Sequence, residues 1–162
     1  MTRLLICASV GILFLAGCAA HNKQTVVTSQ GTTTIERSND NQTVTYSNQQ
    51  GTVTSGKGAV DPAKLGLPIY PGATVNEGGY AGQSAQGSGE VVALSTTDSF
   101  DKVYQWYHDH MPAGSEAMHM TSGESSIASF RLGKDTDKEQ RGVMITADKD
   151  KTSIMLSHSV KP

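Results

Sequence analysis

Two clusters of histidine and methionine are the residues of this chain best suited to holding a metal ion. The first is His108-Asp109-His110-Met111, and the second is Met118-His119-Met120. Imidazole and thioether ligands together suit copper, so the candidate ligands are His108, Met111 and His119. A regular helix turns about 100° per residue, which would place His108 and His110 roughly 160° apart. On a strand, Met118 and Met120 would face away from His119. We therefore favour no metal site and expect the methionines to fill the core.

His110 and His158 have simpler explanations. His110 follows Trp106 by four residues, so on a helix the two rings can stack. His158 alternates with Ile154 and Leu156 along a predicted strand, which indicates a half-buried histidine on the core face.

The sequence offers no catalytic residue that can be named. No pattern brings together a nucleophile, a base and an orienting group. The carboxylates Asp135, Asp137 and Glu139 gather in a predicted turn, where they are surface charges. No cofactor motif stands in its required structural context, so we predict a protein without cofactor that is not an enzyme.

The first residues carry the pattern of an export signal. Arg3 precedes an apolar run over 4–15, and Leu15-Ala16-Gly17-Cys18 closes it. The run is shorter than the roughly 20 apolar residues that a membrane span requires. A basic start, a short apolar segment and small residues are typical of a secretory signal peptide, to which we assign residues 1–17.

Leu15-Ala16-Gly17-Cys18 also resembles the lipobox of bacterial lipoproteins. The resemblance implies that Cys18 is lipid-modified, with palmitate among the expected groups, and begins the mature chain. It implies a lipid-anchored protein of the cell envelope. In a bacterium with two membranes, Ala19 after the cysteine implies the outer membrane, facing the periplasm. Cys7 leaves with the signal peptide, so the mature chain has no disulfide.

The charge of the chain argues against a nucleic-acid partner. The sequence has 13 Lys and Arg residues against 15 Asp and Glu, a net charge of −2. Removal of residues 1–17 takes away Arg3 and no acid, so the net charge moves from −2 to about −3. Binding to nucleic acid would require a basic face.

Residues 18–58 are rich in Thr, Gln, Asn and Ser, and two interpretations are open. A flexible polar tether would carry the rest of the chain away from the membrane. Thr-rich strand–turn–strand arms are the alternative, because Thr and Val favour extended backbone. We prefer the tether, since few apolar residues are present to offset the entropy of ordering.

Residues 59–162 show the patterns of a folded domain. Asp61-Pro62 predicts one helical turn, and Pro71-Gly72 predicts a type II turn. The composition of 78–89 predicts a loop, and 90–95 is a predicted strand. A helix capped by Asp98 follows, with an apolar stripe that consists of Phe100, Val103, Tyr104, Tyr107 and Met111. Four more strands are expected at about 116–121, 126–132, 142–147 and 152–160.

These elements predict an α+β fold, in which one main helix packs on a twisted antiparallel sheet preceded by a polar tether. The motif Pro-Ile-Tyr-Pro-Gly-Ala at 68–73, then Thr97-Asp98-Ser99, then Trp106-Tyr107 resembles an uncharacterised type of small lipoprotein domain. That resemblance implies a fold and no activity.

We therefore expect a membrane-anchored lipoprotein with a non-catalytic binding domain at 59–162. Its partner would be another envelope protein or peptidoglycan. The alternative is a periplasmic carrier of a small ligand or of copper, which would use the His/Met clusters.

Overall fold

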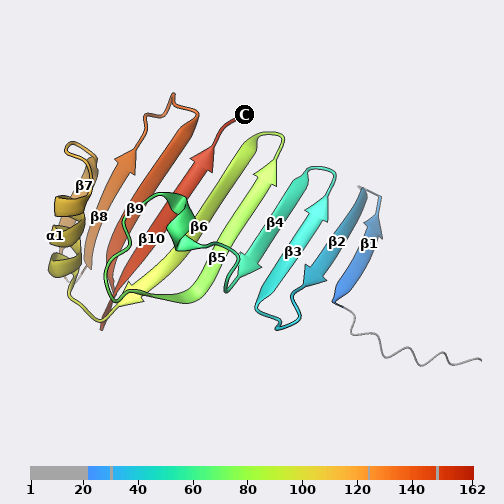
Figure 1. The fold of residues 1–162 in the computed structure, drawn as a ribbon, viewed down its shortest axis with the longest axis horizontal. Helices are drawn as coiled ribbons and strands as arrows, with labels where there is room; N and C mark the ends of the chain where they lie inside the picture. Colours follow the sequence, from blue (N-terminus) through green and yellow to red (C-terminus); the bar gives the residue numbers. More distant parts are fainter. Residues whose placement is uncertain (1–21, 30, 124, 149) are drawn as a thin grey trace, which may run out of the picture.

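Ten antiparallel strands in one sheet dominate the structure. A computed structural model of the chain describes residues 22–29, 31–123, 125–148 and 150–162. The strand order across the sheet is β1-β2-β3-β4-β5-β6-β10-β9-β8-β7 (Figure 1). The predicted signal peptide at 1–17 and the predicted lipid-bearing Cys18 lie outside the described residues.

The first six strands form a meander in which each pairs with the next. Their bounds are β1 Lys23–Thr28, β2 Gly31–Arg37, β3 Thr43–Asn48, β4 Gly51–Gly56, β5 Thr74–Ser84 and β6 Gly87–Thr96. Between β4 and β5 the chain leaves the sheet and forms the 3₁₀ helix η1, Pro62–Leu65.

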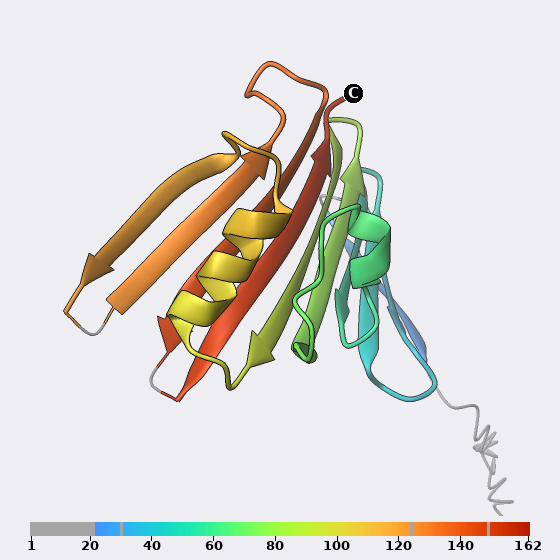
Figure 2. The same cartoon turned by 60° about the vertical axis from the view of Figure 1, so that its left-hand side comes forward.

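The second half of the chain crosses the sheet and returns. The helix α1, Phe100–His110, leads from β6 to the far edge. A meander then comes back through β7 Glu116–Ser122, β8 Ser125–Leu132, β9 Glu139–Asp148 and β10 Lys151–Val160. This path puts β10 beside β6, and α1 and η1 lie on the same face of the sheet (Figure 2).

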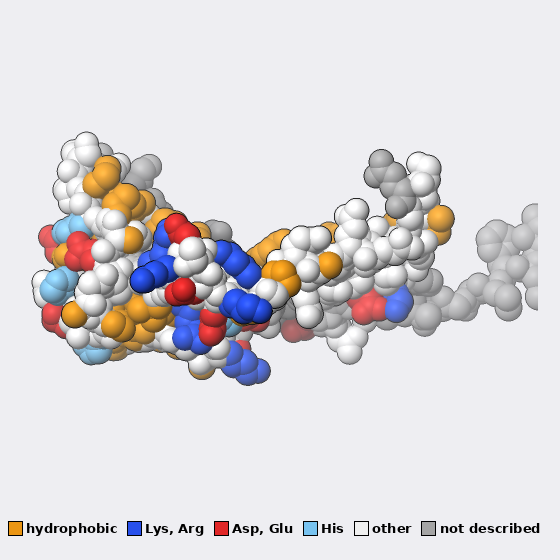
Figure 3. All heavy atoms as spheres, turned by 90° about the horizontal axis from the view of Figure 1, so that it is seen from above, with side chains coloured by type: hydrophobic (Ala, Val, Ile, Leu, Met, Phe, Trp, Pro, Cys, Tyr) orange, Lys and Arg blue, Asp and Glu red, His pale blue; other side chains and the backbone are white. Residues whose placement is uncertain are grey.

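The hydrophobic core lies under α1 and the segment 57–73. Alternate residues of each central strand point into it, as the period of two requires. From the sheet it receives Val92, Leu94, Ala128, Phe130, Val143, Ile145, Ile154 and Leu156, and from the cover Val60, Leu65, Leu67, Tyr70, Phe100, Val103, Tyr107 and Met111. Strands β1 to β4 contribute no buried residue among those described. The molecule is accordingly thick at the covered end and narrows to a thin slab at the other (Figure 3).

The predicted α+β architecture is wrong. In the described residues one α-helix and one short 3₁₀ helix accompany ten strands, so the fold is almost entirely β. The helix contacts β9 and β10. The sheet continues beyond its cover through β1 to β4, where a polar tether was expected.

Residues 23–56 follow the strand–turn–strand alternative. Their strands pair with one another, and β4 pairs with β5, so they continue the sheet of the covered part. Side-chain pairs across strands support them, because opposed hydroxyls bond well on a sheet. Thr45 Oγ1 lies 3.0 Å from Thr54 Oγ1, and Ser47 Oγ lies 3.2 Å from Thr52 Oγ1. Burial was therefore the wrong criterion for this part of the chain.

The predicted loop at 78–89 is also wrong, because its glycines lie in the hairpin of β5 and β6. Glycine permits the close approach of neighbouring groups there. A Cβ added at Gly78 (φ +93°) would lie 2.3 Å from the backbone C and O of Gly56. A Cβ added at Gly79 would lie 2.8 Å from Cβ of Val60.

Several local predictions are confirmed. The helix begins and ends near the predicted residues, and the four C-terminal strands form, with β9 starting earlier than expected at Glu139. Asp61 caps η1, and Gly72 has a φ of +79° in the turn after Pro71.

Asp98 was predicted to cap α1, but the N-cap is Ser99. Asp98 has a different role. Tyr70 Oη donates to Oδ2 of Asp98 at 2.7 Å, and Lys102 Nζ lies 2.9 Å from Oδ1. Oγ1 of Thr152 donates to the carbonyl O of Asp98 at 2.7 Å. The bond from Tyr70 first, and then the bond from Lys102, lower the pKa of the Asp98 carboxyl. Asp98 thus joins the segment 57–73, the start of α1 and the end of the sheet.

Gly78→Ala should destabilise the protein by more than about 2 kcal/mol, because the new Cβ meets backbone that has no room to move. Gly72→Ala is the matched control: its φ is also positive, but an added Cβ meets nothing within 4 Å. The control should cost only the backbone strain, about 1 kcal/mol. Chemical denaturation measures both, and hydrogen exchange in β4 shows whether pairing with β5 is lost. Equal costs would contradict the close approach of Gly78 to Gly56.

Asp98→Asn should destabilise the protein in a pH-dependent way. Because the pKa is lower in the folded state than the ordinary 3.8, the carboxylate stabilises the fold above that value. The contribution is lost as the pH falls through the lowered pKa. The difference in unfolding free energy between wild type and variant should therefore be full at neutral pH and shrink below pH 3.8. Asp101→Asn, in the same helical turn, is the control, and a difference that is constant with pH would contradict the ionised contact.

Candidate ligand-binding groove

One face of the sheet lies opposite α1 and the segment 57–73, and we call it the uncovered face. Residues paired across strands point to the same side, so register defines its members. Met155 lies between the buried Ile154 and Leu156 and therefore points away from the core. Its partners Ala93 and Met144 share that direction.

The uncovered face carries apolar side chains along the whole width of the sheet. On β6 to β10 these side chains are Val91, Ala93, Met118, Met120, Ile127, Met144 and Met155. On β1 to β5 they are Val26, Ile35, Val44, Tyr46, Val53 and Tyr80. Monomeric proteins rarely leave a broad apolar face exposed, and such faces often mark interaction sites. This distribution makes the uncovered face the first candidate for binding.

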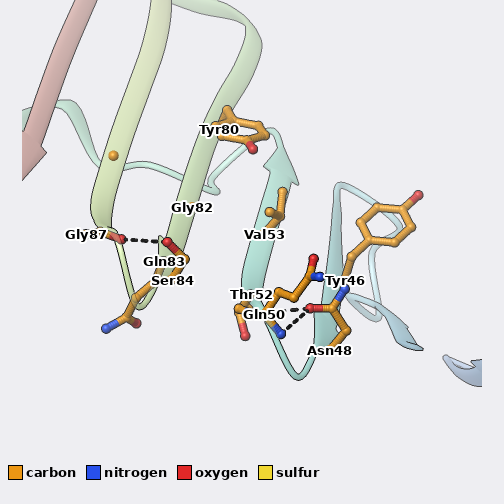
Figure 4. A pocket seen from close by; sticks show the side chains of 12 residues that line it. Tyr46, Asn48, Gln50, Thr52, Val53, Tyr80, Gly82, Gln83, Ser84 and Gly87 are labelled. Carbon is orange, nitrogen blue, oxygen red and sulfur yellow. Dashed lines mark hydrogen bonds between the residues drawn. The ribbon is translucent and has the colours of Figure 1, made fainter. Parts of the chain in front are cut away.

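A groove of about 400 Å³ lies on this face, over β3 to β6. Tyr46 and Tyr80 stand on its two sides with Val53 between them (Figure 4). The residues are 43% and 50% exposed, although tyrosine normally buries much of its ring. The two strands that carry them are separated by β4, which puts them about 10 Å apart in the hydrogen-bonding direction.

Glycines form the floor of the groove. Gly82 and Gly89 are paired across β5 and β6, and Val53 is paired with Gly82 on the other side. A Cβ added at Gly89 would meet nothing within 4 Å, and one at Gly82 would meet only the ring of Tyr80, at 3.4 Å. Neither glycine has a positive φ. The backbone therefore does not require glycine at these two positions.

Neutral polar side chains form the rim at the hairpin ends. The side chains of Asn48, Gln50 and Ser84 line the groove, and none of the described lining residues is charged. Asn48 Oδ1 accepts from the backbone N of Gln50 and Gly51 at 2.9 and 3.1 Å, which fixes this side chain in the turn. Its amide nitrogen is the group that it can offer a ligand.

A second groove of about 300 Å³ lies on the same face, over β8 to β10. Met144 and Met155 contribute apolar surface there, and Gly142 is in its floor. Arg131 is at its border, and its guanidinium is paired with Asp135 at 2.8 Å. Both grooves open on the side of the sheet that has no helix.

The His/Met clusters lie elsewhere, at the end of α1 and on β7. Met111 is buried in the core, while the ring of His119 packs against Tyr104, with ring centroids 3.9 Å apart. The ring of His108 lies 5.9 Å from Tyr104, and its Nε2 lies 4.0 Å from Oε2 of Glu116. Within the part of the chain that the structure describes, no group of three or more His, Cys, Asp or Glu residues could hold a metal ion. Contrary to expectation, Met118 and Met120 point to the uncovered face.

Tyr104 is the centre of this aromatic cluster. Its Oη donates to Oε2 of Glu116 at 3.2 Å. Partial burial, and then this bond to a carboxylate, raise the pKa of Tyr104. The cluster thus contains a neutral phenol that α1 holds against β7.

His110 and His158 are where the sequence placed them. The ring of His110 stacks on Trp106 with centroids 4.1 Å apart, as predicted. His158 is half-buried, with Nε2 2.8 Å from Oε1 of Glu139 and Nδ1 3.6 Å from Oε2 of Glu90. Both are accounted for by protein partners.

Comparison with known proteins adds no relative: no family model, no curated protein and no solved structure matches the chain. Among the described residues, none of the helices has the length and apolar character needed to cross a bilayer.

Sequence reasoning missed the groove. Tyr46 and Tyr80 are on strands that were expected to be a tether and a loop, and β4 separates them. The available signal was the alternation of Tyr and Val with Thr in 43–54, which points these side chains to one face once the segment is a strand.

Proposed function

We propose that the chain is a lipid-anchored, non-catalytic binding protein of the cell envelope and that it binds its partner on the uncovered face of the sheet. Cys18 is the proposed attachment point, and in a bacterium with two membranes the outer membrane, on its periplasmic side, is the proposed location. The partner is an envelope protein or a polymer such as peptidoglycan.

The uncovered apolar face is the observation that supports binding. The backbone hydrogen bonds of β1 to β5 could form with many other side chains and do not require exposed tyrosine or valine. Here Tyr46, Tyr80 and Met155 are exposed on one face, while the core needs none of them. The two grooves lie on that same face.

The position of β1 gives the proposed anchor a mechanical consequence. Lys23, the first residue of β1, follows Cys18 by five residues, a chain of at most about 17 Å. Across ten strands the sheet extends about 40 Å from β1 to β7, from a spacing of about 4.8 Å. Reach from the membrane would thus come from a sheet and not from a flexible tether.

Cys18→Ala should abolish the membrane association of the protein and its labelling by palmitate in growing cells, because no other cysteine remains after residues 1–17 are removed. Cell fractionation and metabolic labelling measure the two effects. Cys7→Ala is the control and should leave both unchanged. A Cys18→Ala protein that still floats with membranes would overturn the anchor.

A photoreactive residue at Met155 should crosslink to an envelope component in intact cells. Met155 is exposed on the uncovered face and lines the second groove. The same residue at Gln105, which is exposed on α1, is the control and should give far less product. Digestion with a muramidase and mass spectrometry then separate peptidoglycan from protein adducts. Equal products from the two positions would contradict binding on the uncovered face.

A further inference from the structure

We propose that the groove between Tyr46 and Tyr80 binds an uncharged oligosaccharide. This inference rests on the proposed function, since it names the class of ligand for part of the uncovered face. It is argued from the walls, the floor and the rim of the groove in turn.

The walls are two exposed tyrosine rings. A phenol ring offers a flat apolar face and one polar tip. The apolar faces of pyranose rings, where C–H groups point outward, pack well on such a surface, while their hydroxyls remain at the edges. Tyr46 and Tyr80 lie on either side of Val53, so a ring-shaped ligand can lie over Val53 and contact both (Figure 4).

The floor consists of glycines at positions where the backbone would accept a side chain. Glycine within a strand weakens it, and it often marks a place where a ligand approaches the backbone. Several other glycines of this sheet are required for backbone reasons: Gly51 and Gly87 have φ values of +154° and +125°, and an added Cβ would clash with backbone oxygen in each. At Gly82 and Gly89 the φ angle is not positive, and an added Cβ would not clash with neighbouring backbone. Their pairing across β5 and β6 leaves an open strip of backbone beside Tyr80.

The side chains of the rim indicate that the ligand is uncharged. The amides of Asn48 and Gln50 can both donate and accept, which suits hydroxyl groups. An anionic ligand would call for Arg or Lys, and a cationic ligand for Asp or Glu. None of these lines the groove. A lipid tail would need an enclosed apolar cavity, whereas this groove is open on the sheet surface and bordered by amides.

Binding can be tested on the full-length protein purified in a zwitterionic detergent, because detergents with sugar headgroups would compete. The probes are hexamers of N-acetylglucosamine, cellulose and maltose, with an anionic alginate hexamer for comparison, and calorimetry measures affinity. At least one neutral hexamer should bind saturably. Tyr80→Ala and Tyr46→Ala should each weaken it by about tenfold or more.

Gly89→Val is the sharper variant. Valine favours a strand and its Cβ meets nothing within 4 Å, so the fold should be retained while the side chain fills the floor. Ser88→Val is the matched control, because it adds the same residue one position away, on the opposite face. Gly89→Val should abolish binding of the neutral hexamer without lowering the melting temperature, and Ser88→Val should retain binding.

Four results would overturn the inference: no saturable binding of any neutral hexamer, tighter binding of alginate, undiminished binding by Gly89→Val, or occupation of the face by a second copy of the chain. The last is seen as a dimer by light scattering that Gly89→Val disrupts. Crosslinking through Met155 without glycan binding would leave the proposed function standing. If the protein binds glycan but its Cys18→Ala variant stays in membranes, only the proposed anchor is overturned.

Discussion

Burial on one side of the central strands is the constraint on which the rest of the structure depends. The chain has apolar residues for one core, and α1 with the segment 57–73 covers the part of the sheet that runs from β5 to β7 in the strand order. Asp98 joins these parts through Tyr70, Lys102 and Thr152. Strand β5 lies at the border of the covered part, and β4 to β1 extend the sheet from it. They need no core of their own.

The two halves of the fold were accessible to sequence reasoning to different degrees. The stripe of Phe100, Val103, Tyr107 and Met111 predicted α1, because a helix that buries one side must repeat apolar residues at its own period. The strands after it are predictable for the same reason. No described residue of β1 to β4 is fully buried, and their apolar residues are too few to predict a core face. Their order comes from pairing with β5, a segment distant in the sequence that itself resembled a loop.

The same physics explains why the candidate groove was missed. The groove combines residues of β3, β4, β5 and β6, and only the strand order brings them together. Glycine has two opposite uses in these strands. At Gly78 it lets β5 approach Gly56 closely, whereas at Gly89 it leaves space open above the sheet. Composition alone does not separate these uses, and both contributed to the prediction of a loop at 78–89.

A rigid sheet in place of a tether also restricts where a ligand can be met. If Cys18 carries the lipid, β1 begins at most about 17 Å along the chain from it. The groove spans β3 to β6, which are about 10 to 24 Å from β1 across the sheet, at about 4.8 Å per strand. A ligand in the groove would therefore lie within about 40 Å of the lipid. A flexible arm would have allowed a wide volume to be searched. If the anchor is at Cys18, the sheet would instead favour a partner that is itself fixed near the membrane surface, such as a polymer layer.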